Sequence, residues 1–179
     1  MTAPVFVDTN VLVYARDAGH AAKQARAAAW LEILWREQLG RTSVQVLSEY
    51  YVTLTRKLDP GIPSAEAWDD VSALFTWRPQ TIDVAIMQRG REIEQRYRLS
   101  WWDSLIVAAA AAQGCALLLS EDFQDGGVYA GVTVRSPFTL SVDEPAATYA
   151  AASAAARGHP RRGRPRRARA ARPSLDNLS

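Results

Sequence analysis

Two short apolar runs that each lead into an acidic residue constrain the fold of this chain most. Val5–Val7 is followed by Asp8, and the run 116–119 leads to Asp122. Continuous apolar runs of this length are typical of strands that are buried on both faces, as in a parallel sheet covered by helices. Because the carboxyl ends of parallel strands meet at one edge, we expect Asp8 and Asp122 to open onto the same edge of the sheet.

The segments between these runs have the periodicity of helices. Gly40 is expected to stop one helix, and Ser43 is a good N-cap for the next. Short apolar strands that alternate with helices predict an α/β fold, with a parallel sheet between layers of helices. Helices are expected at about 10–16, 20–39, 45–57, 64–77, 84–98 and 102–113, with further strands at 80–83 and 132–138.

The charge of the chain is divided unevenly along its length. Of the 179 residues, 48% are hydrophobic, which is enough for one ordinary domain with a core. Residues 1–144 hold 13 Lys and Arg against 18 Asp and Glu, a net charge of −5. Residues 145–179 hold eight Arg and one Asp, a net charge of +7. We therefore expect an acidic domain over 1–142 and a basic tail over 143–179.

The tail is rich in Ala, Arg and Pro and has almost no large apolar residue. Such a composition cannot bury a core and predicts disorder. Two interpretations of its role stay open. The arginines could bind RNA phosphates without sequence preference and with a strong salt dependence. Alternatively, the tail could be a solvated extension without a binding role.

Further features point to a soluble protein in a reducing compartment. Cys115 is the one cysteine and stands in an apolar run, so a disulfide framework is excluded. The N-terminus has no positively charged segment followed by an apolar stretch, so no signal peptide is predicted. The longest apolar run is far shorter than the roughly 20 residues that a membrane-spanning helix needs. We expect a cytoplasmic protein without a membrane partner.

Several acids stand at the predicted ends of strands or on helices near them, and each also has an ordinary structural interpretation. Asp8 and Asp103 could be helix N-caps. Glu49 could be a solvated residue on its helix. Asp122 and Asp125 could form a turn, since Asp before Gly is a common turn signal.

Taken together, the acids favour a metal site. Carboxylates that gather in one cleft repel one another and raise each other's pKa unless a cation neutralises them. Oxygen ligands without nearby His or Cys suit Mg²⁺ or Mn²⁺ rather than zinc. The two histidines, His20 and His159, lie at a helix entry and in the tail, and we interpret both as non-catalytic.

Four segments in series resemble the motifs of the PIN-domain ribonucleases, especially the VapC-type toxins of bacterial toxin–antitoxin modules. They are FVDTNVLVYA, VLSEYYVTLTRK, WWDSLIVAAA and LLSEDFQDG, in the family's order and spacing. The resemblance covers roughly residues 4–140. It implies a PIN-like three-layer α/β/α fold with a short central parallel sheet surrounded by helices. The basic tail lies outside the family pattern.

The resemblance also implies which residues form the site. The acids Asp8, Glu49, Asp103 and Asp122 would be catalytic and would hold the metal. In the family's last motif the acid stands at either of two nearby positions, so Asp125 is a further metal ligand candidate, ranked below Asp122. The polar residues that would support the acids are Thr9, Asn10 and Ser120.

The activity that the resemblance implies is that of an Mg²⁺-dependent (or Mn²⁺-dependent) endoribonuclease, a hydrolase of RNA phosphodiester bonds. It further implies the toxin role in a type II toxin–antitoxin system, a cognate antitoxin protein as partner, and a homodimer. The alternative is a catalytically inactive PIN-fold module that binds RNA or a partner. Trp101 and Trp102, beside Asp103, could stack on bases or pack in the core.

Overall fold

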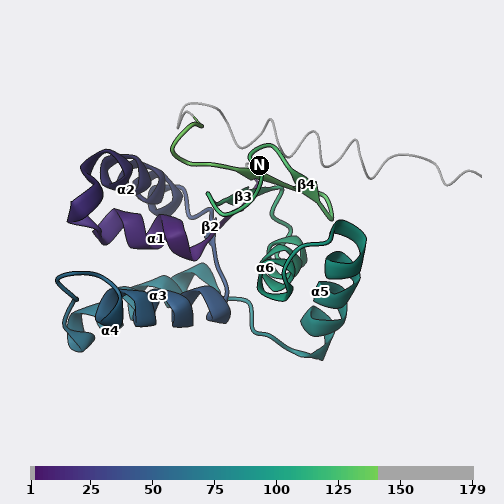
Figure 1. Ribbon diagram of the computed structural model, residues 1–179, viewed down its shortest axis with the longest axis horizontal. Coiled ribbons are helices and arrows are strands. Elements are labelled where there is room, and N and C mark those ends of the chain that lie inside the picture. Colours follow the sequence, from purple (N-terminus) through teal and green to yellow (C-terminus); the bar gives the residue numbers. More distant parts are fainter. Residues whose placement is uncertain (1–2, 141–179) are drawn as a thin grey trace, which may run out of the picture.

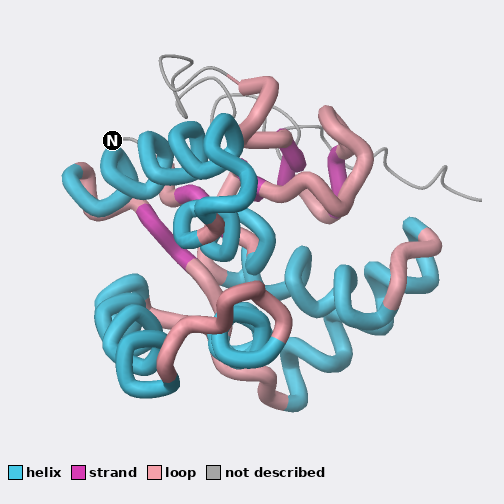
Figure 2. Tube along the Cα trace, turned by 60° about the vertical axis from the view of Figure 1, so that its left-hand side comes forward, coloured by secondary structure: helices cyan, strands magenta, loops and turns pink. Residues whose placement is uncertain are grey.

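The computed structural model describes residues 3–140 of the chain, which fold into one sheet of five short strands flanked by helices (Figures 1 and 2). This confirms the predicted α/β class. The predicted basic tail, 143–179, and both interpretations of its role lie outside the described residues. The strands are β1 (Val5–Val7), β2 (Gly40–Arg41), β3 (Leu117–Leu119), β4 (Val128–Tyr129) and β5 (Val132–Arg135).

The helices lie on both sides of this sheet. In Figure 1, α1 and α2 lie to the left of the strands, α3 and α4 lie at the lower left, and α5 and α6 lie together below the strands and towards the right. The helices are α1 (Thr9–Arg16), α2 (Ala21–Arg36), α3 (Val44–Arg56), α4 (Ser64–Ala73), α5 (Val84–Tyr97) and α6 (Trp101–Ala112), with short 3-10 turns at Ala18–His20 and Leu74–Trp77.

The strand order is β2-β1-β3-β5-β4, and every pair except one is parallel. In the centre of the sheet, Val7 of β1 pairs with Leu119 of β3. The exception is β4, which pairs antiparallel with β5 through a turn in which Ala130 and Gly131 have positive φ. The sequence did not predict β4, because two residues of strand give no periodic pattern.

The core surrounds the sheet and takes buried residues from each of the helices α1 to α6. Every residue of β1 and β3 is buried, as expected for strands covered on both faces. The residues of α6 from Ser104 to Ala110 are buried all round, so the longest apolar run of the chain is a central helix. α5 packs against α6 at Gly90, where an added Cβ would lie 2.9 Å from Leu105 Cδ2. No helix among residues 3–140 has the length and apolarity needed to cross a membrane.

The predicted strand at 80–83 is absent. Gln80 alone forms a bridge, in which its N–H donates to the carbonyl of Thr42 and its own carbonyl accepts from Val44. Pairing stops there because Ser43 caps α3, so its chain has turned into a helix and offers no further strand to pair with. Asp83 instead caps α5, accepting from the backbone N–H of Ile86 at 2.8 Å. The predicted cap at Ser43 is confirmed.

Gly40 does not stop the preceding helix, as the sequence analysis expected. α2 ends at Arg36, Gln38 takes the left-handed conformation (φ 56°), and Gly40 belongs to β2. A Cβ at Gly40 would lie 2.3 Å from Cε2 of Trp77. The indole of Trp77 therefore occupies the space that any other side chain at position 40 would need.

Replacing Gly40 by alanine is expected to lower the free energy of unfolding by about 1–3 kcal/mol, because the new methyl group overpacks the core against Trp77. Urea denaturation measures the change. A Gly40→Ala, Trp77→Leu double variant is the control, since a smaller side chain at position 77 removes the clash. The double variant should be more stable than the sum of the two single changes. Strict additivity would contradict this explanation.

Candidate active site

Asp8 lies at the carboxyl end of β1, where the strand passes directly into α1. Its side chain is only 3% exposed. Oδ1 accepts from the backbone N–H of Thr9 at 2.7 Å, and Oδ2 accepts from the hydroxyl of Ser120 at 2.7 Å. Because Val7 and Leu119 are paired in parallel, the residues that follow them, Asp8 and Ser120, leave adjacent strands at the same edge.

Asn10 joins Asp8 to Asp122. Its amide Nδ2 lies 3.3 Å from Oδ2 of Asp8, 3.1 Å from the hydroxyl of Ser120 and 2.9 Å from Oδ2 of Asp122. The backbone N–H of Asp122 in turn donates to the Ser120 hydroxyl at 3.1 Å. Residues separated by 112 positions along the chain thus share one hydrogen-bond network.

Glu49 reaches the same network from α3. The Thr9 hydroxyl donates to its Oε2 at 3.0 Å, and the Gln45 amide donates to its Oε1 at 3.1 Å. Both carboxylate oxygens of Glu49 therefore have a donor within the protein, although the residue is exposed. Sequence reasoning missed Gln45, for which the signal was its position one helical turn before Glu49.

Asp103 lies in the first turn of α6 and is half-buried. It is not the helix cap, because Ser100 takes that role and accepts from the backbone N–H of Asp103 at 3.1 Å. Among the described residues, no hydrogen bond or ion pair joins Asp103 to the other acids. The nearest link is indirect: the Gln45 amide that holds Glu49 also lies 3.4 Å from the carbonyl oxygen of Trp102.

The side chains around this network line one groove between α1, α3 and the loop after β3. Asp8 is buried and contacts the groove through Asn10. Glu121 also lines the groove. It forms an ion pair with Lys23 at 2.6 Å, which offsets its negative charge. The groove is lined by Thr9, Asn10, Val13, Tyr14, Ser48, Glu49, Val52, Thr53, Lys57, Glu121 and Asp122.

Burial raises the pKa of Asp8 from 3.8 to about 7. The hydrogen bonds from the Ser120 hydroxyl and the Thr9 backbone N–H oppose this, since they stabilise the carboxylate. The negative charges of Asp122 and Glu49 raise the pKa further. Burial and the neighbouring charges thus disfavour the ionised form of Asp8, and a bound cation would favour it.

The donor set fits a hard divalent cation. The candidate ligands are carboxylate oxygens, and the Oδ1 of Asn10 is a buried acceptor without a hydrogen-bond partner among the described residues. The orientation of this amide is fixed chemically, because its nitrogen faces two carboxylates and a hydroxyl. Within residues 3–140, no three His, Cys, Asp or Glu side chains already stand close enough together to hold a metal ion. The acids are bridged instead by the hydrogen bonds of Thr9, Asn10 and Ser120.

Asp125 lies outside this network. Its Oδ1 accepts from Nε of Arg135 at 3.0 Å and from the backbone N–H of Ser136 at 2.9 Å, and its Oδ2 from Thr139 at 3.3 Å. The Ser136 hydrogen bond is the main cause that lowers the pKa of Asp125, with Arg135 adding to it. Asp125 fastens the end of β5 to the preceding loop, and a metal role for it stays a prediction. Asp122 is the acid of this loop that the structure brings to Asp8.

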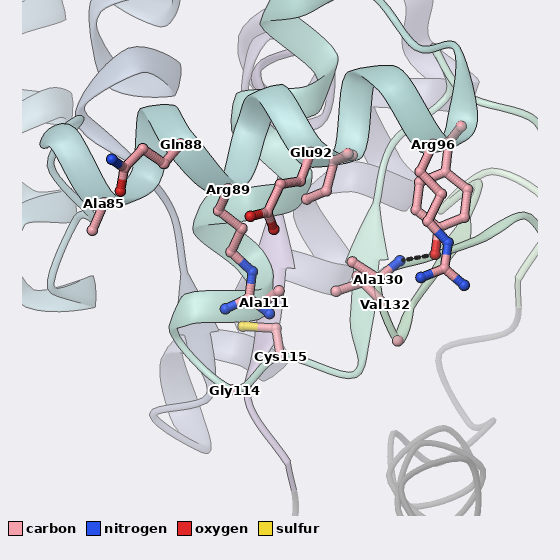
Figure 3. Close-up of a pocket in the computed structure, with 13 residues that line it drawn as sticks. Ala85, Gln88, Arg89, Glu92, Arg96, Ala111, Gly114, Cys115, Ala130 and Val132 are labelled. Atoms are coloured by element: carbon pink, nitrogen blue, oxygen red, sulfur yellow. Dashed lines mark hydrogen bonds between the residues drawn. The ribbon is translucent and has the colours of Figure 1, made fainter. Parts of the chain in front are cut away.

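A second hollow lies between α5 and the β4–β5 turn (Figure 3). It opens beside Cys115, which precedes β3, whereas the acidic groove opens where β3 ends. The two hollows therefore lie at opposite ends of this strand. Glu92 is its one acid, on the same helix as Arg89 and Arg96. This hollow gathers no group of carboxylates and is not the candidate active site.

Comparison with known families agrees with this geometry. The sequence model of the PIN domain family matches residues 5–124. The matched span contains Asp8, Glu49, Asp103 and Asp122, and it ends one residue before Asp125. No curated protein matches the chain.

Asp8→Asn is expected to stabilise the metal-free protein at neutral and alkaline pH. The pKa of Asp8 is 3.8 in the unfolded chain and about 7 in the folded one, so between these values the folded state binds the extra proton. The free energy of unfolding therefore falls as the pH rises through this window. Removing the charge should recover on the order of 4 kcal/mol at about pH 8 and little below about pH 4.

Urea denaturation in EDTA at both pH values measures this effect. Asp125→Asn is the matched control, because the pKa of Asp125 is lowered and neutralising it should destabilise the protein at neutral pH. Destabilisation by Asp8→Asn at about pH 8 would show that the neighbouring donors outweigh the burial of Asp8.

Proposed function

Because the chain belongs to the PIN domain family, whose fold is that of metal-dependent nucleases, we propose that it is an endoribonuclease that hydrolyses RNA phosphodiester bonds with Mg²⁺ or Mn²⁺. The observation that carries this proposal is the network of Asp8, Glu49 and Asp122. These acids come from three distant parts of the chain, and the hydrogen bonds of Thr9, Asn10 and Ser120 connect them in one groove.

The protein's own groups have distinct tasks in this proposal. Asp8, Glu49 and Asp122, with Asp103 at the start of α6, would hold the cation. Ser120 and the Thr9 backbone N–H fix the orientation of the Asp8 carboxylate, so that it does not need to be reorganised when charge arrives. When bound, a divalent cation supplies an activated water and stabilises the charge that develops on the phosphate.

RNA is the substrate that the family resemblance favours, but the domain itself is not a basic surface. Residues 1–144 have a net charge of −5. Lys23 is paired with Glu121, and Arg16 is paired with Glu66 and Asp70. Lys57 lines the groove and has no ion pair within the described residues, so it is the cation best placed to contact an RNA phosphate.

The proposal extends to a toxin of a type II toxin–antitoxin module, acting in the cytoplasm, with a small antitoxin protein and a second copy of the chain as partners. Exposed apolar side chains between α3 and α4 support a protein partner. Trp68 is 53% exposed and Phe75 is 50% exposed, and with Val52 they line an apolar groove. Apolar surface of this kind on a small domain is typical of a protein interface.

The central test is cleavage of a mixed RNA pool by the purified protein with Mg²⁺, with Mn²⁺ and with EDTA. We expect cleavage that requires metal, and a loss on the order of 100-fold or more in Asp8→Asn, Glu49→Gln and Asp122→Asn, since each change removes a negative ligand. Asp125→Asn is the matched control in the same loop and should stay within a few-fold of wild type.

Metal binding should be visible without activity. Mn²⁺ is expected to raise the melting temperature of the wild-type protein but not that of Asp8→Asn, because only the folded state binds the ion. Folded protein that neither cuts RNA nor responds to Mn²⁺ would favour the alternative, an inactive PIN-fold binding module. Loss of activity in Asp125→Asn with activity retained in Asp122→Asn would exchange the roles of these two acids.

A further inference from the structure

A further hollow, distinct from the one in Figure 3, lies beside the acidic groove and is more apolar than it. Its walls include Val44, Ile82 and Trp102, and it shares Ser48 and Glu49 with the acidic groove. The two hollows therefore adjoin at one turn of α3.

Trp102 is the most prominent group in this hollow. It is 59% exposed, and its neighbours Val44 and Ile82 are 44% and 41% exposed. Trp68 is similarly exposed, but its ring packs edge-on against Tyr51 and Phe75. Within residues 3–140 the ring of Trp102 contacts no other aromatic ring, so its face is available to a ligand.

The backbone that carries Trp102 is fixed relative to the acids. Ser100 caps α6 and sets the start of the helix, so Trp102 occupies its first turn next to Asp103. The buried Gln45 amide donates both to the Trp102 carbonyl oxygen at 3.4 Å and to Glu49 Oε1 at 3.1 Å. One side chain therefore ties the apolar hollow to the acidic network.

A flat, uncharged, aromatic surface beside acids suits a nucleobase better than a phosphate. Glu49 and Asp103 repel phosphate oxygens, whereas every base has a π-face that stacks on indole. The domain is net acidic, so stacking gives affinity for RNA where charge attraction is weak. The hollow shares Ser48 and Glu49 with the acidic groove, so it adjoins the site where the scissile phosphate would be held.

We propose that this hollow is a base-binding subsite in which Trp102 stacks on a base of single-stranded RNA next to the scissile phosphate. The inference rests on the proposed function, since it names how that site would hold its substrate. Stacking is tolerant of sequence, so Trp102 contributes affinity and position rather than recognition of one base.

The test compares Trp102→Ala and Trp102→Phe in the full-length protein. The control is Met87→Ala, which shortens an exposed apolar side chain on α5. Single-stranded RNA is used as the ligand, with binding followed by fluorescence anisotropy and cleavage followed with Mn²⁺. Trp102→Ala should weaken RNA binding and raise KM by about 5-fold to 100-fold, the range measured for loss of one stacked base. Trp102→Phe should recover most of this loss, and Met87→Ala should behave as wild type.

An RNA with one abasic position separates stacking from a general loss of structure. Once the wild-type cleavage site is mapped, the base on either side is removed in turn. At one of these positions, wild type should bind the abasic RNA as weakly as Trp102→Ala binds intact RNA. The Trp102→Ala variant should bind the abasic RNA no more weakly than it binds intact RNA.

The outcomes distinguish this inference from the proposed function. If wild type cleaves RNA and Trp102→Ala binds and cleaves like Met87→Ala, the subsite is overturned and the nuclease proposal stands. If wild type binds RNA without cleaving it and Trp102→Ala weakens binding, the subsite stands and the nuclease proposal fails. If wild type cleaves RNA from the mixed pool but does not bind single-stranded RNA, the subsite is overturned and the nuclease proposal stands.

Discussion

The parallel pairing of β1 with β3 is the constraint on which the rest of the site depends. Val7 and Leu119 are in register, so the chain leaves both strands at the same edge, with Asp8 and Ser120 as the next residues. The short distance between the Ser120 hydroxyl and the Asp8 carboxylate follows from this register. Because side chains alternate between the faces of a sheet, a shift of one residue would turn these groups away from each other.

Burial of Asp8 links the stability of the protein to the chemistry proposed for it. An acid with an exposed fraction of 3% and a pKa raised to about 7 is unfavourable in its charged form, and nearby Asp122 and Glu49 add to the repulsion. The fold tolerates this because short hydrogen bonds hold the carboxylate in place. Functional sites are commonly where a fold keeps such unfavourable arrangements.

Much of this arrangement could be predicted from the sequence, because it depends on local patterns and on one general rule. Continuous apolar runs predicted β1 and β3, and the meeting of parallel strand ends predicted that Asp8 and Asp122 would lie at one edge. The features that were missed depend on distant contacts. Gly40 looks like a helix stop until the indole of Trp77 is seen against it.

The acids of the loop after β3 show the same limit. Local sequence does not distinguish Asp122 from Asp125, since both are close to a turn. Their hydrogen-bond partners distinguish them. Asn10, which is 112 residues away, donates to Asp122, whereas Arg135 on β5 donates to Asp125. Gln45 was missed because a glutamine on a helix does not indicate a functional site until its spatial neighbours are known.

The order in which the partners of this hydrogen-bond network are synthesised also determines when the groove can form. Asp8 and Glu49 are made early in synthesis, but Ser120 and Asp122 come from the third quarter of the sequence. β3 must enter the sheet beside β1 before Asn10 has both of its acidic partners. Domains fold as units while their amino-terminal part emerges first. A nascent chain without β3 therefore has no assembled acidic groove, and the site is completed only after most of the domain has left the ribosome.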